Sequence, residues 1–308
     1  MRRPALHGIL ITYRRSAAFR KILARLGEQT RPLDRLVVVD NDPSPEVEAA
    51  LADYRSTGRQ ADYVGTAENL GPAGGIALGM QEVLGFATDD DWAVLLDDDD
   101  PPEDPDLLGR LETFAHQVSN RDPRTAGVGV MGARFDWLRG RPAPVPDGDL
   151  EGVVVVDYVG GNKLPTYRVG VFREVGTFRD DLFFGFDDLE FGLRVKAAGY
   201  RLYVDGAAWR QRRARRGRLG AERAPSAVLD EPGWRRYYSL RNMIWILRSH
   251  GRDATAARLA LLAGVGKPLA NMVRSPALAR RHLALGWRAC GDGWAGRMGR
   301  TVEPTGRA

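Results

Sequence analysis

Residues 92–100 read WAVLLDDDD, five apolar residues that run directly into four aspartates. A short apolar run of this kind is typical of a buried strand. Two earlier stretches follow the same design, GILIT at Gly8–Thr12 and RLVVV at Arg35–Val39, and the second ends on DND at residues 40–42. Between these apolar runs lie segments whose apolar residues recur at helical spacing. Alternating strands and helices predict βαβ units and a largely parallel α/β sheet. Ligands bind at the carboxyl ends of such strands, so we expect one shared crevice there.

The remaining sequence extends this alternation and then becomes helical. We expect helices over Ser16–Gly27, Glu46–Arg55, Gly74–Leu84 and Asp187–Ala198, and further strands over Asp62–Gly65, Val128–Phe135, Gly152–Val159 and residues 202–209. From Trp234 onward the pattern is helical and rich in Ala, Leu and Arg. We therefore divide the chain into an α/β domain that carries the site, residues 1–218, and a basic helical extension packed on it, residues 219–308.

Charge is distributed unevenly along the chain. The net charge of +5 combines −10 over residues 1–205, with 24 Lys or Arg against 34 Asp or Glu, and +15 over residues 206–308, with 21 against 6. Such a basic tail is either a solvated helical face or a contact for phosphate, membrane headgroups or nucleic acid. No helix-turn-helix, zinc-finger or aromatic RNA-binding signature accompanies it, so we expect no nucleic-acid partner.

The cysteine content and the apolar segments bear on the compartment. A single cysteine, Cys290, excludes an intramolecular disulfide and a cysteine-based zinc site, which favours a reducing compartment. The apolar run at residues 8–11 is too short for a signal peptide, and Arg258 and Pro268 interrupt the best membrane-span candidate, Ala254–Val273. We expect a cytoplasmic protein. Ala254–Val273 would either pack on the α/β domain or lie at a membrane interface.

The four aspartates at residues 97–100 are the most specific feature. Clustered carboxylates repel one another unless a cation or hydrogen bonds compensate. Oxygen ligands suit a hard divalent ion such as Mg²⁺ or Mn²⁺, which commonly binds one or two carboxylates and substrate phosphates. A solvated acidic loop is the alternative. We favour the metal because the preceding strand directs the aspartates toward the expected crevice.

A glycine-rich turn, ENLGPAGG at Glu68–Gly75, opens a predicted helix. Glycines let a backbone approach a phosphate closely, and a helix N-terminus favours anions, although the same residues would also suit a turn without a ligand. The spacing matches neither G-x-G-x-x-G nor G-x-x-x-x-G-K-[ST], and GVGKP at Gly264–Pro268 also fails the second pattern. Both standard nucleotide motifs are therefore absent from the sequence.

The segment FFGFDDLEFGLR at residues 183–194 places two acids in the first turn of a predicted helix, beside aromatic residues. Aromatic neighbours desolvate a carboxylate, and Asp188 with a raised pKa would serve as a general base. Helix capping is the alternative, because first-turn acids stabilise the helix dipole by about 0.3 to 1 kcal/mol.

A run of arginines, RQRRARRGR at Arg210–Arg218, is followed by YYSLRN at Tyr237–Asn242. Guanidinium groups bind phosphate oxygens bidentately, so a flexible arginine-rich loop near a nucleotide would neutralise a departing diphosphate. An exposed basic loop without a ligand is the alternative.

In this order, the segments resemble the family-2 glycosyltransferases, inverting enzymes with a glycosyltransferase A-type fold, a Rossmann-like and mostly parallel sheet flanked by helices. The resemblance runs from about Gly8 to Asn242. The motifs that carry it are Thr12-Tyr13, Val39-Asp40-Asn41, Asn69-x-Gly71-x-x-Gly74-Gly75, Asp97-Asp98-Asp99 in place of D-x-D, and Asp187-Asp188-x-Glu190 in place of E/D-D-x-D/E. ITYRR, VVDND, NLGPAGGIALGM and YYSLRN are most similar to actinobacterial galactofuranosyltransferases and related rhamnosyltransferases.

The resemblance implies a role for each motif. Tyr13, Asp40 and Asn41 would bracket the nucleotide base. Asp97 would face the ribose and the metal, Asp99 would ligate the metal that bridges the diphosphate, and Asp188 would be the base. Thr12, Asn69, Gly71, Gly74 and Asp98 complete the expected donor site. Gly161, Asn162 and Asp187 form the expected acceptor site.

One position departs from the pattern of the family. Many relatives place a metal-binding histidine after the final strand, where this chain has Gln211. The metal would then have fewer protein ligands or use the amide oxygen of Gln211. We assign the metal to Asp97, Asp99 and Gln211. Neighbouring arginines would take over part of the charge neutralisation.

The resemblance therefore predicts an inverting transferase that moves a sugar, galactofuranose or rhamnose, from a UDP or dTDP donor to a hydroxyl of a glycan, glycolipid or small-molecule acceptor. Mg²⁺ or Mn²⁺ is the expected cofactor, and the basic extension is expected at the anionic inner face of the membrane. The alternatives are a sugar nucleotidyltransferase, which usually has a Gly-rich loop where this chain has ITYRRS, and a non-catalytic sugar- or nucleic-acid-binding module, against which the retained acids argue.

Overall fold

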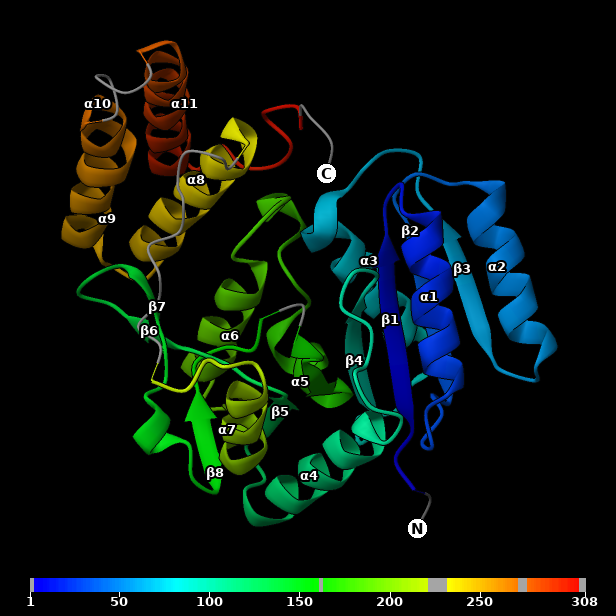
Figure 1. Ribbon diagram of the computed structural model, residues 1–308. Helices are drawn as coiled ribbons and strands as arrows, with labels where there is room; N and C mark the ends of the chain where they lie inside the picture. The colour runs from blue at the N-terminus through cyan, green and yellow to red at the C-terminus, as the bar shows by residue number, and fades with distance from the viewer. Residues whose placement is uncertain (1–2, 161–162, 221–231, 271–275, 305–308) are drawn as a thin grey trace. The chain divides into compact units, whose positions relative to one another are not determined.

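Figure 1 shows the computed structural model, which describes residues 3–160, 163–220, 232–270 and 276–304. The chain forms two compact units. The first comprises Met1–Arg134, Pro144–Asp180 and Asp188–Gly220, and the second comprises Phe135–Ala143, Asp181–Asp187 and Ala221–Ala308. Two short segments from the first 220 residues thus belong to the second unit, which a single cut after residue 218 does not capture.

The first unit is built on an eight-stranded sheet of order β3-β2-β1-β4-β9-β5-β10-β8. Its strands are β1 (Leu6–Thr12), β2 (Arg35–Asp40), β3 (Ala61–Gly65), β4 (Trp92–Asp97), β5 (Thr125–Gly129), β8 (Val153–Val156), β9 (Thr166–Arg168) and β10 (Arg201–Asp205). β1 pairs in parallel with β2 and β4, whereas β9 and β8 run antiparallel to their neighbours. The predicted α/β class with a mostly parallel sheet is confirmed.

Helices cover both faces of this sheet. They are α1 (Ser16–Gly27), α2 (Pro45–Ser56), α3 (Gly71–Phe86), α4 (Leu107–Arg121), α5 (Val169–Val175), α6 (Asp187–Ala197) and α7 (Gly206–Arg215), with short 3₁₀ turns at η1 (Asp147–Asp149) and η3 (Asp180–Leu182). Successive strand residues point to opposite faces, so Ile9 joins the core beneath α3, α5 and α6 while Leu10 joins the core beneath α1, α2 and α4.

Several elements differ from the sequence-based expectation: the strand expected over Val128–Phe135 is not continuous, and β9 and α5 were not expected. The strand expected over 202–209 ends at Asp205, whose carboxylate caps α7 by accepting a hydrogen bond from the Ala208 N–H at 3.0 Å. Most of the arginine run expected as a flexible loop is therefore helix α7. Helix α4 was not expected, although Leu107, Leu111, Ala115 and Val118 are spaced to bury one helical face.

The second unit is mainly helical. Its elements are the hairpin strands β6 (Arg134–Asp136) and β7 (Arg141–Ala143), the helices α8 (Gly233–Ser249), α9 (Asp253–Leu259), α10 (Lys267–Ala270) and α11 (Pro276–Ala295), and the π-helix η4 (Ala260–Gly266). η4 and α11 cross closely, because a Cβ on Gly286 would lie 2.6 Å from the carbonyl oxygen of Gly264. Among the described helices, none is long and apolar enough to cross a bilayer.

Candidate functional site

The carboxyl ends of β1, β2 and β4 meet at one edge of the sheet. Thr12 at the end of β1 stands opposite Asp40 at the end of β2, and Ile11 stands opposite Asp97 at the end of β4. Across this edge the Thr12 hydroxyl donates a hydrogen bond to Asp98 Oδ2 at 2.9 Å. Residues separated by more than eighty positions in sequence thus share one site.

Asp97, Asp98 and Asp99 form the centre of this site. Each offers a carboxylate oxygen, and the three atoms lie within 4.8 Å of one another. Burial first, and then the charges of Asp99 and Asp98, raise the pKa of Asp97 to about 6. Burial also raises the pKa of Asp98, against the opposing effects of Thr12 and Arg15. Burial and mutual repulsion thus disfavour the charged forms of Asp97 and Asp98, a cost that a bound cation would offset, and three hard oxygen donors fit Mg²⁺ or Mn²⁺.

Arg15 supplies the nearest positive charge. From the N-cap position of α1, its Nη1 donates to Asp99 Oδ2 at 2.7 Å and lies 3.2 Å from Asp98 Oδ1. The sequence interpretation assigned no role to Arg15. Its place three residues after Thr12 was the available signal, because it follows the end of the first strand.

Asp40 and Asn41 shape the neighbouring strand end. Asp40 is fully buried, and its carboxylate accepts hydrogen bonds from the Asp42 N–H at 3.1 Å and the Tyr63 hydroxyl at 3.1 Å. Asn41 donates from Nδ2 to the Gly71 carbonyl at 3.2 Å. Asp40 therefore holds the turn after β2, and Asn41 ties that turn to the glycine-rich segment. Tyr13 is half-buried, with the Arg14 guanidinium 5.0 Å from its ring centroid.

The glycine-rich turn begins α3 beside this edge. Gly71 has φ +71°, a conformation that favours glycine, and its N–H donates to Asn69 Oδ1 at 2.8 Å. Gly74 and Gly75 lie in the first turn of α3, and a Cβ on Gly75 would lie 3.0 Å from Ile11 Cγ2 and 3.2 Å from Asn41 Nδ2. The glycines thus allow the start of α3 to pack directly on the ends of β1 and β2.

Asp188 begins the part of α6 that belongs to the first unit. It is half-buried, while Asp187 before it is 8% exposed. Glu190, two residues further on, pairs with Arg194 through contacts of 3.0 and 2.9 Å, and Arg194 also donates to the Val175 carbonyl. Glu190 is therefore held in a structural ion pair, and of these acids Asp188 is the more exposed.

The turn that leads into α6 has an unusual backbone. Phe183 and Phe186 have φ values of +60° and +64°, and Gly185 has φ +79°. Left-handed conformations are costly for aromatic residues unless surrounding contacts hold them. Asn242 on α8 provides such contacts.

Asn242 Nδ2 lies 3.0, 3.0 and 2.8 Å from the carbonyl oxygens of Leu182, Phe184 and Gly185. Arg241 beside it is fully buried and donates to the Leu182 carbonyl at 2.9 Å. These two residues of the YYSLRN motif hold the turn that delivers Asp187 and Asp188. The sequence interpretation used them only for the resemblance.

Further cations lie next to the fourth aspartate. Lys163 Nζ lies 3.5 Å from Asp100 Oδ2, and Arg212 on α7 pairs with Glu103 at 3.0 Å. Gln211 is exposed on α7 and lines a second pocket together with Arg212, between α4 and α7. No hydrogen bond among the described residues joins Gln211 to the aspartates, so its role as a metal ligand stays a prediction. Gly161 and Asn162 lie outside the described residues.

Comparison with known proteins identifies the part of the chain that carries this edge. Residues 9–139 match the family described as Glycosyl transferase family 2. Residues 9–139 are a glycosyl transferase family 2 domain. The matched residues include the second half of β1, all of β2 to β5 and the whole aspartate triplet.

A curated relative and two solved structures extend the comparison. Galactofuranosyltransferase GlfT1 of Mycolicibacterium smegmatis is 38% identical over 113 residues, which are 36% of this chain and 35% of that protein. The match thus spans about a third of the curated relative.

Mannosyltransferase PcManGT from Pyrobaculum calidifontis, in complex with GDP-Man and Mn²⁺, aligns with a TM-score of 0.52 at 17% identity over 96% of this chain and 88% of that one. GalNAc-T7 with UDP, GalNAc and Mn²⁺ aligns with a TM-score of 0.54 at 11% identity over 80% of this chain and 48% of that one. At these identities the two structures show the fold, which is the expected glycosyltransferase A-type fold.

Proposed function

We propose that the chain is an inverting glycosyltransferase that moves a sugar from a nucleoside diphosphate donor to an acceptor hydroxyl. The observation that carries the proposal is the convergence of Thr12, Asp98 and the other triplet aspartates at the end of β1 and β4. The similarity to a galactofuranosyltransferase supports galactofuranose as the sugar, and UDP is the carrier that we assign to it. Rhamnose from a dTDP donor is the second candidate sugar.

Donor binding is assigned to the strand ends and the glycine-rich turn. Tyr13 is assigned to the base, and Asp40 and Asn41 fix the turn that borders it. Asp97 faces the ribose, with Asp98 beside it in the donor site. Asp97 and Asp99 would hold Mg²⁺ or Mn²⁺, which when bound offsets the negative charge of the diphosphate. Arg15 and Lys163 add positive charge at the same edge, where they contact Asp99 and Asp100. Together these residues favour departure of the nucleoside diphosphate.

Proton transfer is assigned to Asp188. Its carboxylate takes the proton of the acceptor hydroxyl, whose oxygen forms a bond to the anomeric carbon from the face opposite the diphosphate. The bond between that carbon and the diphosphate oxygen breaks, and both electrons leave with the nucleoside diphosphate. A single displacement of this kind inverts the anomeric centre. Arg241 and Asn242 fix the turn before Asp188, and Asp187 is assigned to the acceptor side.

Asp188→Asn tests this assignment. The variant keeps the shape of the side chain but cannot accept the proton, so we expect kcat to fall about 10²- to 10⁴-fold. The dissociation constant for UDP, measured by calorimetry, should stay unchanged. Asp253→Asn is the matched control, because Asp253 is an exposed first-turn acid of α9 and is assigned to neither the donor, the metal nor the acceptor. Normal turnover by Asp188→Asn would show that another group is the base.

Metal dependence is tested separately. We expect excess chelator to abolish transfer and Mn²⁺ or Mg²⁺ to restore it. A UDP-induced rise in Tm that requires the metal would assign the ion to donor binding, since ligand at 100 times its Kd adds about 2.7 kcal/mol of stability. Full activity in chelator would instead assign charge neutralisation to the arginines.

Contact with an anionic membrane surface is part of the proposal. It is supported by the net charge of +15 over residues 206–308. The chain should sediment with vesicles that contain phosphatidylglycerol, and salt should release it. Equal sedimentation with neutral phosphatidylcholine vesicles would contradict an electrostatic attachment.

A further inference from the structure

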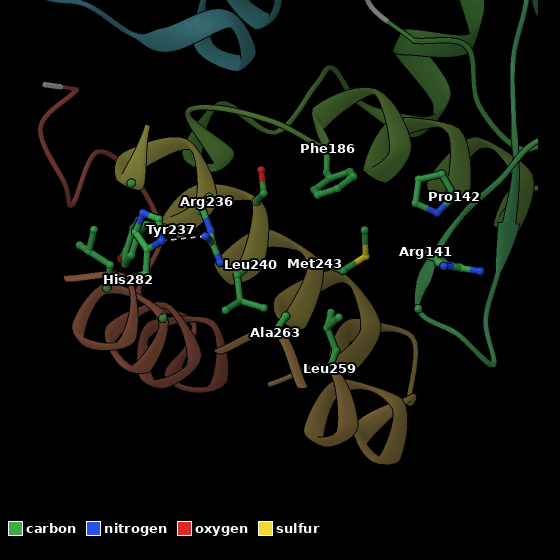
Figure 2. A pocket seen from close by; sticks show the side chains of 15 residues that line it. Arg141, Pro142, Phe186, Arg236, Tyr237, Leu240, Met243, Leu259, Ala263 and His282 are labelled. Carbon is green, nitrogen blue, oxygen red and sulfur yellow. Dashed lines mark hydrogen bonds between the residues drawn. The ribbon is translucent and has the colours of Figure 1, made fainter. Parts of the chain in front are cut away.

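A pocket of about 270 Å³ lies among the helices of the second unit (Figure 2). α8 forms its long wall, Leu259 and Ala263 come from α9 and η4, and His282 and Leu285 come from α11. All of its lining residues belong to the second unit, and none was assigned to the donor, the metal or the base. The pocket is therefore a separate site that sugar transfer does not explain.

The pocket is elongated along α8. Its lining on that helix runs from Gly233 to Met243, which at 1.5 Å rise per residue corresponds to about 15 Å. A site of this length and volume suits an extended chain better than a compact ring system. The conformational freedom of Met243 and Leu240 would let the wall adapt to such a chain.

An arginine lies at each end of the pocket, but only one end has an ordered polar pair. Figure 2 shows Arg236 and His282 toward one end and Met243, Phe186 and Pro142 toward the other, where the exposed Arg141 also lies. The polar pair is ordered, because Arg236 Nη1 donates to His282 Nδ1 at 2.8 Å. Burial first, and then Arg236 and Arg281, lower the pKa of His282, so the imidazole is neutral near pH 7 and can accept this hydrogen bond.

The side chains along the rest of the pocket are mostly apolar. Leu240, Leu259, Ala263 and Leu285 line it, and no Asp or Glu is among the lining residues in the part of the chain that the structure describes. A guanidinium oriented at one end of an apolar trough is complementary to a phosphate or carboxylate that carries a hydrocarbon chain.

We propose that this pocket binds one single-chain anionic amphiphile, with its anionic group on Arg236 and its chain against Leu240 and Met243. The inference rests on the proposed membrane contact, because a lipid of an anionic surface is the source of such a molecule. It does not depend on sugar transfer, so either proposal can fail without the other.

Direct binding to the full chain is the first test, with dodecyl phosphate below its micellar concentration as the probe. We expect saturable binding of one molecule per chain by calorimetry. Inorganic phosphate lacks the hydrocarbon chain and dodecanol lacks the anionic group, so each should bind at least tenfold more weakly than dodecyl phosphate. Equal binding of dodecanol and dodecyl phosphate would overturn the role of Arg236, and no saturable binding of dodecyl phosphate would overturn the pocket itself.

Two variants locate the binding site. Arg236→Gln removes the guanidinium to which the anionic group is assigned, while Arg141 at the other end stays, and should weaken dodecyl phosphate binding at least tenfold. Ala263→Phe fills the apolar trough and should abolish saturable binding. Arg280→Gln and Ala257→Phe are the matched controls, because both residues are exposed and neither lines the pocket. Wild-type affinity in both pocket variants would overturn the proposal. Circular dichroism checks that each variant folds, and the probe series on the wild type stands even if one does not.

Vesicles distinguish a membrane lipid from a soluble amphiphile. Phosphatidylcholine vesicles that contain an anionic lysophospholipid should bind the wild type more tightly than Ala263→Phe. Binding that is equal in the two proteins would overturn the lipid source, and a soluble amphiphile would then be the ligand. Nucleotide-sugar turnover without acceptor, measured in the same samples, reports on the donor site alone.

Discussion

The two ends of strand β4 carry aspartates in opposite electrostatic situations. Asp91, just before the strand, accepts hydrogen bonds from the N–H groups of Ala5 and Thr88, both at 2.8 Å. Burial would raise the pKa of Asp91, but these backbone donors outweigh it and hold the pKa below its usual value. Asp97 at the other end has its pKa raised to about 6, first by burial and then by its two neighbours.

The opposite pKa shifts indicate different roles: Asp91 stabilises the fold, whereas Asp97 is held in place although its charge destabilises the fold. Asp91 stabilises the folded chain above its unfolded pKa, and this stabilisation is lost as the pH falls through its lowered folded pKa. The effect of Asp97 has the opposite sign. Ionisation of Asp97 destabilises the folded chain, in full above about pH 6, and this cost shrinks as the pH falls below 6 and is gone below the unfolded value of 3.8. A site that is costly without its ligand is typical of a functional centre.

The largest expected effect comes from Asp99→Asn, at the end of β4 assigned to function. Loss of a metal-binding carboxylate removes several kcal/mol of charge stabilisation, so we expect turnover to fall about 10²-fold or more. The unfolding free energy should change by less than about 0.5 kcal/mol, because the Asp99 side chain is 54% exposed. Steady-state kinetics and urea unfolding measure the two quantities. A large stability loss with normal turnover would reverse the comparison.

Asp97→Asn should stabilise the protein while it impairs activity. The raised pKa corresponds to about 1 to 3 kcal/mol at pH 7.5 in the absence of divalent metal. The gain over the wild type should shrink as the pH falls from 7.5 to 4.5, because Asp97 then becomes protonated. Chemical denaturation across this pH range checks the prediction, and a constant difference would contradict it.

Asp91→Asn should have the reverse outcome. It replaces an acceptor that is held by two backbone N–H groups and lies 3.5 Å from His7 Nε2. We expect a loss of about 1 to 2 kcal/mol in unfolding free energy at pH 7 and unchanged kcat at permissive temperature. The deficit should narrow as the pH falls below about 4, and it should be smallest below the lowered folded pKa of Asp91, where the wild-type carboxylate is protonated as well. A kcat that fell with stability intact would place Asp91 in the functional site.

Arg15→Gln should produce the smallest change. Arg15 competes with a cation for Asp99 Oδ2, from which its Nη1 lies 2.7 Å. Its removal should therefore tighten Mn²⁺ binding a few-fold, equivalent to about 1 kcal/mol or less. Calorimetric titration with Mn²⁺ measures this, with the exposed Arg20→Gln as control. Weaker Mn²⁺ binding would show that Arg15 supports the metal rather than competing with it.

Much of the sheet could be predicted from the sequence, because its strands are buried and their apolar runs end sharply. The expected strand at Trp92–Leu96 and the expected edge strand at Asp62–Gly65 each fall within one residue of β4 and β3. β9 is only three residues long, which is too short to show an apolar run or an alternation of apolar and polar residues. Helix α7 gave little pattern because it buries only Gly206 and Trp209, and it is held by nonlocal contacts such as Arg213 to Asp147.

The site was predictable to a similar degree. Polar residues after buried strands indicated the edge where Thr12 and Asp98 meet, because parallel strands bring their carboxyl ends together. The left-handed backbone at Phe183 and Phe186 could not be predicted, since neither residue type favours it. It depends on Asn242, which lies more than fifty residues later and reaches these carbonyls only through the tertiary structure.

That distance in sequence gives the chain an order of assembly. On the ribosome, the strands that hold the aspartate triplet are synthesised long before Asn242, the amide that fixes the turn in front of Asp188. A nascent chain could therefore fold its donor-binding half while its proposed proton acceptor is still unsecured. Full competence would wait for the helix that contains Asn242, so an incomplete polypeptide would hold nucleotide sugar without consuming it.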